Sequence, residues 1–289
     1  MSLVTVLAQV GAGVLVLHLL ALVTVVGRER LAAAPDRVRS NLWNVAPTLG
    51  LLLVVLAVNG VVRDLGVELS WLVGVNVTGR IHALEGQLVA ELQSLATPGL
   101  TAYFAGVYVF GYAFLLTFPV LAYLLYEDPR PLRALLVAYV VNYCLGLVCY
   151  VLFISYGPRN FMPDLVESLL YTNWPQVQLL TGQVNRNTNV FPSLHTSLSV
   201  TVALVGYRYR QVCTRWVPVA TGLAASIAVS TMYLGIHWAT DVVGGVLLAA
   251  LAVGFAALTV ERRPPDWRPA GGERVDRWSE AAAEWFRKR

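Results

Sequence analysis

The sequence has little charge and almost no lysine. Of its 289 residues, 13% are charged and 57% are hydrophobic, and the mean hydropathy is +0.62. Soluble domains carry about 25% charged residues, so this composition excludes a soluble globular protein and predicts a polytopic membrane protein. Lys288 is the one lysine among 21 basic residues and lies near the C-terminus. A retinal protein needs a lysine inside a membrane helix for its Schiff base, so that class is excluded.

Cysteine is also scarce, and motifs for metal sites and proteases are absent. Cys144 and Cys149 fall in one apolar run and Cys213 in a short loop, which gives neither a disulfide framework nor metal-ligand spacing. Without H-E-x-x-H or G-x-S-x-G, an intramembrane protease is disfavoured. The net charge of +4 comes from arginines dispersed over loops, so nucleic acid is not an expected partner. We expect no metal and no cofactor.

Seven apolar runs are candidates for membrane helices. A helix needs about 20 apolar residues to cross a hydrocarbon core of roughly 30 Å, and the fifth run is rather short. The sequence predicts an all-α membrane helical bundle with three parts: an N-terminal helix and basic loop (1–44), a six-helix core (45–260) and a polar tail (261–289). A generic seven-helix receptor is the non-enzymatic alternative. The predicted spans are Leu3–Val26, Val45–Val62, Leu100–Tyr126, Ala134–Tyr156, Phe191–Tyr207, Val217–Ile236 and Val242–Val260.

Residues 63–99, between the second and third spans, mix polar and apolar side chains. Four apolar residues recur at helical spacing, which predicts an amphipathic helix lying in the membrane interface. His82 and Glu85 could reach a lipid headgroup, or they could form a solvated helix face. The four apolar residues are Ile81, Leu84, Leu88 and Leu92.

The basic residues are distributed unevenly between the two sides of the predicted bundle. Seventeen of the 21 fall in the first, third and fifth loops and the tail. Arg63, Arg80, Arg159 and Arg186 are the other four. The positive-inside rule therefore predicts a multi-pass cell-membrane protein with its N-terminus outside and its C-terminus in the cytoplasm.

Two of the four histidines lie where apolar runs begin or end. His237 precedes Asp241 by four residues, a spacing that puts both side chains on one face of a helix. The carboxylate can then accept the imidazole Nδ1–H and leave Nε2 as a base or nucleophile. His195 opens on the same side because two runs separate it from His237, which suggests phosphoryl or acyl transfer. His18, in the middle of the first run, is expected to be a packing residue.

The residues around both histidines resemble motifs of a known family. Phe191-Pro192-Ser193-Leu194-His195 resembles the second motif, P-S-G-H, of the type 2 phosphatidate phosphatase superfamily. Ser230 to Asp241 resembles its third motif, S-R-x5-H-x3-D, and the wording is most similar to the branch of fungal inositol phosphorylceramide synthase, an inositolphosphotransferase. The resemblance implies that the six-helix core is phosphatase-like. It also implies that His237 attacks phosphorus, Asp241 orients it and His195 protonates the leaving group.

Two motifs depart from the family pattern. The arginine of the third motif is Thr231 here. In the first motif, K-x6-R-P, Arg159 can stand for the arginine, but Leu152 and Asn160 occupy the lysine and proline positions. Two of the three usual cations are therefore missing, and the phosphate-binding arrangement is expected to differ from the family's.

Four residues are candidates for binding phosphate. The fork of the Arg159 guanidinium can grip two oxygens at once. Arg186 is the second choice, with a solvated loop charge as its alternative. The free backbone N–H groups at the start of the helix near Ser193 offer an anion-binding site, although Ser193 could also cap that helix. Asn189, at the head of the second-motif stretch, completes the set.

The resemblance implies an integral-membrane lipid phosphatase or phosphotransferase that acts on phospholipid or isoprenoid-phosphate substrates through a phosphohistidine. Water as the acceptor would make it a phosphatase, and a lipid or polyol hydroxyl would make it a transferase; the branch resemblance favours transfer. Thr231 and Leu152 favour the alternative, a catalytically inactive lipid-binding or transport protein of the same fold. We expect a membrane lipid and the bilayer as partners, with the site on the extracytoplasmic face; the oligomeric state stays open.

Overall fold

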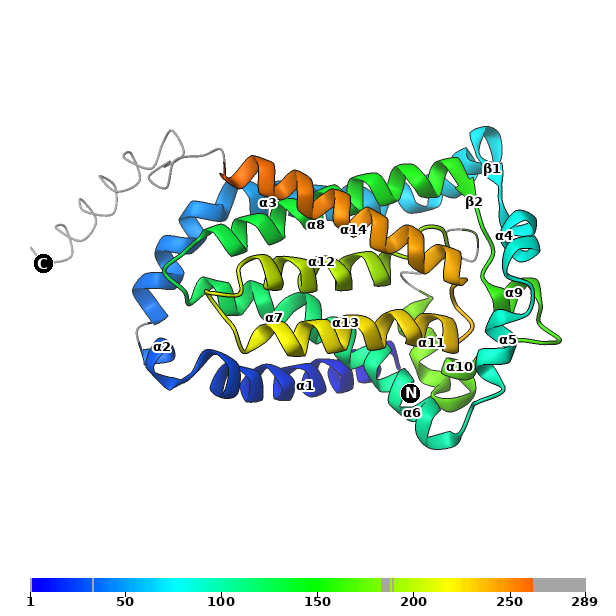
Figure 1. Ribbon diagram of the computed structural model, residues 1–289, viewed down its shortest axis with the longest axis horizontal. Helices are drawn as coiled ribbons and strands as arrows, with labels where there is room; N and C mark the ends of the chain where they lie inside the picture. The colour runs from blue at the N-terminus through cyan, green and yellow to red at the C-terminus, as the bar shows by residue number, and fades with distance from the viewer. Residues whose placement is uncertain (1, 33, 183–187, 189, 262–289) are drawn as a thin grey trace, which may run out of the picture.

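The protein is a bundle of long helices that run along one axis (Figure 1). The structure is a computed structural model that describes residues 2–32, 34–182, 188 and 190–261. The predicted tail therefore lies outside the described residues, apart from Glu261. The predicted domain boundary at residue 45 falls inside a continuous helix. The long helices are α1 (Leu3–Ala21), α3 (Ala34–Val73), α7 (Tyr112–Leu124), α8 (Arg130–Leu152), α12 (Leu194–Arg208), α13 (Trp216–Tyr233) and α14 (Ala239–Glu261).

Six stretches among the described residues are long and apolar enough to cross a membrane, and they overlap six of the seven predicted spans. The first of them, Leu3–Val26, consists of α1 and the π-helix η1 (Leu22–Val26). The third consists of α6 (Pro98–Gly106), η2 (Val107–Gly111) and α7. The predicted multi-pass helical bundle is confirmed.

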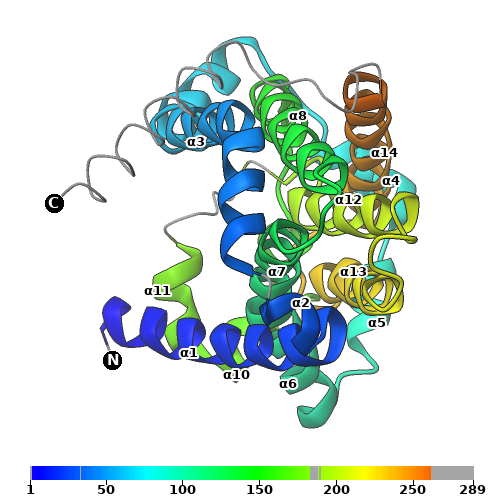
Figure 2. The same cartoon turned by 90° about the vertical axis from the view of Figure 1, so that its left-hand side faces the viewer.

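The remaining predicted span is the fifth, Phe191–Tyr207, and it corresponds to α12, which has only 15 residues. It packs against α7, α8, α13 and α14, and it lies between α14 and α13 in Figure 2. Because neighbouring helices rather than lipid surround α12, it does not need the length of a lipid-exposed span.

Short elements gather at both ends of the bundle. One end, called the strand end here, carries the two-stranded parallel sheet of β1 (Val75–Asn76) and β2 (Phe153–Ile154). It also carries α4 (Thr78–Glu85), α5 (Leu88–Gln93), α9 (Pro158–Phe161), α10 (Leu169–Asn173), η3 (Pro175–Val177) and α11 (Gln178–Thr181). The other end, called the α2 end, carries α2 (Arg28–Ala32) and the turns 125–129 and 209–215.

The prediction of one amphipathic helix between the second and third spans is wrong. α3 extends to Val73, and the helical part that follows is split into α4 and α5 around Gly86, which has a φ of 59°. Ile81 is buried, whereas Leu84 and Leu88 are exposed. The four apolar residues therefore do not share a face, because their period runs across a break in the helix.

Polar side chains inside the bundle connect α8 to α12. Asn142, Ser197 and Thr201 are all fully buried. The Asn142 amide donates to Thr201 Oγ1 at 3.0 Å and to the Ala138 carbonyl at 2.8 Å, and the Ser197 hydroxyl donates to Asn142 Oδ1. These bonds satisfy groups that would be costly to leave unpaired in an apolar interior.

α14 packs closely against the first turn of α12. A Cβ added to Gly245 would lie 2.5 Å from the Ser193 carbonyl oxygen and 3.0 Å from Thr196 Cβ. In the same place the Ser193 N–H donates to the Asp241 carbonyl at 2.9 Å. Glycine therefore permits a close approach that holds the starts of the two helices together at the strand end.

We expect Gly245→Ala to lower the free energy of unfolding by about 1–3 kcal/mol, because the new methyl group meets backbone that cannot move aside. Gly254→Ala is the matched control on the same helix, since no atom lies within 4 Å of its added Cβ. Thermal unfolding of both variants in detergent micelles measures the difference. Equal melting temperatures would contradict the close packing of α14 on α12.

Candidate active site

The described members of the predicted catalytic set lie together at the strand end. His237 is in the turn between α13 and α14, Asp241 is in the first turn of α14, and His195 is in the first turn of α12. His237 Nδ1 lies 3.4 Å from Asp241 Oδ2. The ring centroids of His195 and His237 are 6.2 Å apart. The two imidazoles and the carboxylate therefore form one cluster.

The contact between His237 and Asp241 does not come from a shared helix face, and that part of the prediction is wrong. α14 begins at Ala239, so His237 precedes the helix. The Asp241 carboxylate instead turns back over the start of α14, where its Oδ2 also accepts the Trp238 N–H at 2.9 Å. One carboxylate therefore satisfies a free amide at the helix start and orients the imidazole.

The turn that carries His237 is fixed by its surroundings. The His237 N–H donates to the Thr231 carbonyl at 3.0 Å. Gly235 adopts a φ of 71°, in the left-handed region that favours glycine. Trp238 is fully buried, and its indole N–H donates to the Tyr156 carbonyl at 2.8 Å. His237 is thus presented by a rigid turn.

Glu85 positions the start of α14. Its carboxylate accepts the Ala239 N–H at 2.9 Å and the Thr240 N–H, two amides that lack partners within the helix. A negative charge is also favourable at the positive end of the helix dipole. Glu85 is therefore a cap for a helix that lies 154 residues away in sequence, rather than part of a solvated face. Its neighbour His82 packs against the Trp238 ring at 6.0 Å.

Two tyrosines hold the ring of His195. Tyr108 stacks on it at a centroid distance of 4.7 Å, and Tyr112 packs against it at 4.6 Å. No motif in the sequence marks these tyrosines, because they lie within an ordinary apolar run. Together they restrict rotation of the imidazole next to His237.

Arg159 lies on α9, directly against the His237 turn. Its N–H donates to the Gly235 carbonyl at 3.1 Å. A Cβ on Gly157 would overlap the Ile236 carbonyl oxygen, so the two segments are in backbone contact. This contact places the segment that resembles the family's first motif, around Arg159, beside the third motif, around His237.

The Arg159 guanidinium is partly free. It lies 4.7 Å from the centre of the Tyr171 ring, and its Nη2 donates to the Tyr171 hydroxyl at 3.3 Å. Its Nη1 is buried and has no hydrogen-bond partner among the described residues, and the same holds for Asp241 Oδ1. A buried, unpaired guanidinium N–H is a donor that an anionic oxygen would satisfy.

The other predicted phosphate contacts differ from Arg159. Ser193 is fully buried, its Oγ accepts the Thr196 N–H at 3.3 Å, and its own N–H is bonded to Asp241. The capping role predicted for Ser193 is therefore confirmed, but its amide is not available as an anion seat. Arg186 and Asn189 lie outside the described residues.

The two positions where the family pattern has cations hold none here. Thr231 is fully buried, and its hydroxyl donates to the Ala228 carbonyl at 2.8 Å. Leu152 ends α8 and is 44% exposed. His18 is a packing residue, as predicted, because its ring contacts the Val14 carbonyl at 2.7 Å and Thr117 Oγ1 at 3.1 Å.

This arrangement can carry out group transfer to an imidazole. Asp241 contacts Nδ1 of His237 and leaves Nε2 available for attack. His195 is close enough to exchange a proton with the opposite side of a small group that is bound between the two rings. The unpaired N–H of Arg159 favours an anionic group over a neutral acyl group. Phosphoryl transfer is therefore the chemistry that the site fits best.

We expect Glu85→Ala to lower the free energy of unfolding by about 0.5–2 kcal/mol. It should also reduce kcat with little change in KM, because Asp241 loses its fixed position at the start of α14. Glu85→Gln keeps one acceptor and should restore part of the rate. Glu91→Ala, at an exposed position on α5, is the control. A stability loss without any change in kcat would limit Glu85 to a structural role.

Comparison with known proteins identifies the family. A family model described as PAP2 superfamily matches residues 81–255, which include every described residue of the site. No curated protein and no solved structure matches the chain. The match covers more than half of the 289 residues and confirms the superfamily that the motifs resemble. The chain therefore belongs to the PAP2 superfamily.

Proposed function

We propose that the protein is a metal-independent membrane phosphatase or phosphotransferase that works through a phosphohistidine at His237. Superfamily membership supports the class of reaction. The observation that carries the proposal is the cluster of His195, His237 and Asp241 beside a guanidinium with an unpaired N–H.

In the first step, Nε2 of His237 attacks phosphorus, and the bond from phosphorus to the leaving oxygen breaks. His195 donates its proton to that oxygen, and the alcohol departs. Asp241 stabilises the positive charge that develops on His237. Attack requires about 3–3.5 Å between Nε2 and phosphorus, and proton transfer requires about 2.6–3.2 Å between His195 and the leaving oxygen. The ring centroids are 6.2 Å apart, which leaves room for a phosphoryl group that meets both requirements.

Charge on the transferred group is stabilised by Arg159. The Tyr171 ring and the Tyr171 hydroxyl hold the guanidinium before substrate arrives. A donor that is fixed in advance costs no reorganisation during the reaction. The free Nη1–H is the contact that we assign to a phosphate oxygen.

In the second step, His195 takes a proton from the acceptor, whose oxygen attacks phosphorus while the bond from phosphorus to His237 breaks. Water as the acceptor gives a phosphatase, and a lipid or polyol hydroxyl gives a transferase. We favour transfer, because the second and third motifs resemble the inositolphosphotransferase branch. The substrate class that we propose is a phospholipid or an isoprenoid phosphate.

We place the strand end, and with it the site, on the extracytoplasmic face of the cell membrane. Most arginines of the described loops lie at the α2 end, whereas Arg80 and Arg159 lie at the strand end. The positive-inside rule then puts the α2 end and the C-terminus in the cytoplasm.

A catalytically inactive protein that binds or transports lipid is the second candidate. Buried Thr231 and outward-facing Leu152 favour it, because neither supplies a cation to the phosphate. Lipid binding without any turnover across a panel of phospholipids and isoprenoid phosphates would select this candidate.

We expect His237→Ala to reduce phosphate release or headgroup transfer by about 10³-fold or more, because the nucleophile is lost. The wild type should stay active in EDTA and be inhibited by vanadate. Mass spectrometry of the products distinguishes hydrolysis from transfer. His18→Ala, which removes a packing histidine, is the control and should keep its turnover. Undiminished activity of His237→Ala would refute the phosphohistidine.

We expect His195→Asn to slow turnover of an alkyl phosphate donor by about 10²–10⁴-fold, the usual contribution of a general acid. With p-nitrophenyl phosphate the first step should be slowed much less, because its leaving group needs no proton. Single-turnover release of the alkyl alcohol and of p-nitrophenol measures the two rates. An equal loss with both donors would show that His195 is not the acid.

A further inference from the structure

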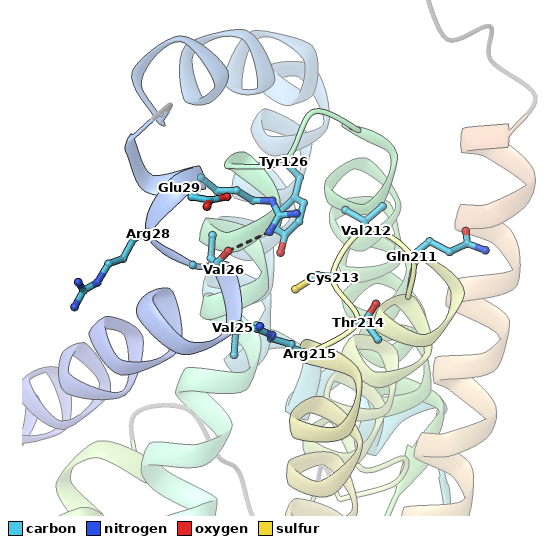
Figure 3. A pocket seen from close by; sticks show the side chains of 12 residues that line it. Val25, Val26, Arg28, Glu29, Tyr126, Gln211, Val212, Cys213, Thr214 and Arg215 are labelled. Carbon is cyan, nitrogen blue, oxygen red and sulfur yellow. Dashed lines mark hydrogen bonds between the residues drawn. The ribbon is translucent and has the colours of Figure 1, made fainter.

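The α2 end contains a pocket of about 520 Å³ (Figure 3). It lies at the opposite end of the bundle from the strand end, which carries the His237 turn (Figure 1). This volume lies within the range of pockets that hold small ligands. Its walls come from three separate segments: residues 25–30 at the end of η1 and the start of α2, Tyr126 after α7, and residues 211–215 in the turn between α12 and α13.

Two arginines in this pocket are held by main-chain carbonyls. Arg30 Nη1 donates to the Val26 carbonyl at 3.2 Å, and Arg215 Nη1 donates to the Thr24 carbonyl at 3.1 Å. The Arg30 guanidinium also lies 4.7 Å from the centre of the Tyr126 ring. Each guanidinium has five N–H donors, so both keep donors for a ligand.

Neither Arg30 nor Arg215 has a carboxylate partner among the described residues. This distinguishes them from three other arginines at the α2 end, each of which is paired with an acid. Those pairs are Arg37 with Glu127, Arg130 with Asp128 and Arg208 with Glu261. Among the described residues, no carboxylate forms an ion pair with Arg30 or Arg215.

Tyr126 adds a neutral donor to the same pocket. Burial and the contact with Cys213 raise the pKa of its hydroxyl, while Arg30 and Arg215 act in the opposite direction. The hydroxyl is therefore protonated at neutral pH. Arg30, Arg215 and Tyr126 all line the same pocket.

The remaining charged residues of the lining have different positions. Glu29 lines the pocket but forms no ion pair with Arg30 or Arg215. The Arg28 side chain extends away from Tyr126 and Arg215 (Figure 3). Arg28 and Glu29 therefore offer matched controls, because their substitution changes the local charge without removing the guanidinium groups of Arg30 and Arg215.

We propose that this pocket binds a phosphate-bearing anion through the guanidinium groups of Arg30 and Arg215 and the hydroxyl of Tyr126. Arginine presents donors only, in a fork that suits the oxygens of phosphate. The phosphate can belong to the headgroup of an anionic lipid in the adjacent leaflet or to a soluble anion. Once bound, it links the end of η1 to the turn between α12 and α13. The site uses no residue of the proposed catalytic cluster.

The test measures thermal unfolding of the full-length protein in lipid nanodiscs. One set contains phosphatidylcholine alone, a second contains added phosphatidylglycerol, and a third contains phosphatidylcholine with inorganic phosphate at constant ionic strength. We expect an anion to raise the melting temperature of the wild type. The variant with both Arg30→Gln and Arg215→Gln should lose that rise, with an affinity at least about tenfold weaker.

Arg28→Gln should keep the wild-type shift, and Glu29→Gln should keep or increase it. A shift with phosphatidylglycerol alone identifies a lipid headgroup, and a shift with inorganic phosphate as well identifies a soluble anion. The proposal is overturned by a wild type that responds to neither anion, or by a double variant that responds like the wild type. The single variants repeat the comparison if the double variant does not fold. Because the readout is binding, it does not depend on turnover at His237.

Discussion

The hydrogen bond from the Ser193 N–H to the Asp241 carbonyl joins the first turns of α12 and α14, and the geometry of the site depends on it. His195 follows Ser193 by two residues, and the Asp241 side chain contacts His237. One main-chain bond therefore sets the position of one histidine relative to the other. It can form because Gly245 has no side chain to separate the helices. Helix packing and catalytic geometry are thus one constraint.

At the start of α14, a group that caps the helix is also part of the proposed catalytic cluster. Helix amides without partners are expensive in a membrane protein, because no bulk solvent is available to satisfy them. Glu85 accepts two of these amides and Asp241 accepts the Trp238 N–H. The Asp241 carboxylate that caps the helix is also the one that orients His237. Two acids can lie close together here because the positive end of the helix dipole favours both.

Hydropathy predicts the bundle, because lipid-exposed helices need long apolar runs. Motif spacing predicts the pairing of His195 with His237, because it depends on residues that are close together in the sequence. The role of Glu85 could not be predicted, since its partners are 154 residues away and no local pattern marks them. The contacts of Tyr108 and Tyr112 with His195 could not be predicted either, because an aromatic residue in an apolar run is typical of a core position. The predicted amphipathic helix fails for a related reason: periodicity over residues 81–92 does not reveal the break at Gly86.

The loss of two motif cations bears on the proposed substrate. Thr231 is fully buried and Leu152 faces outward, so Arg159 is the one motif cation that remains among the described residues. A phosphodiester carries one negative charge, whereas a phosphomonoester carries close to two at neutral pH. One guanidinium balances the diester better. In the mechanism that we propose, attack of His237 on a diester would leave a headgroup phosphate on the imidazole, and another hydroxyl would be the natural acceptor for that group. The reduced charge of the site therefore supports headgroup transfer over hydrolysis of a monoester.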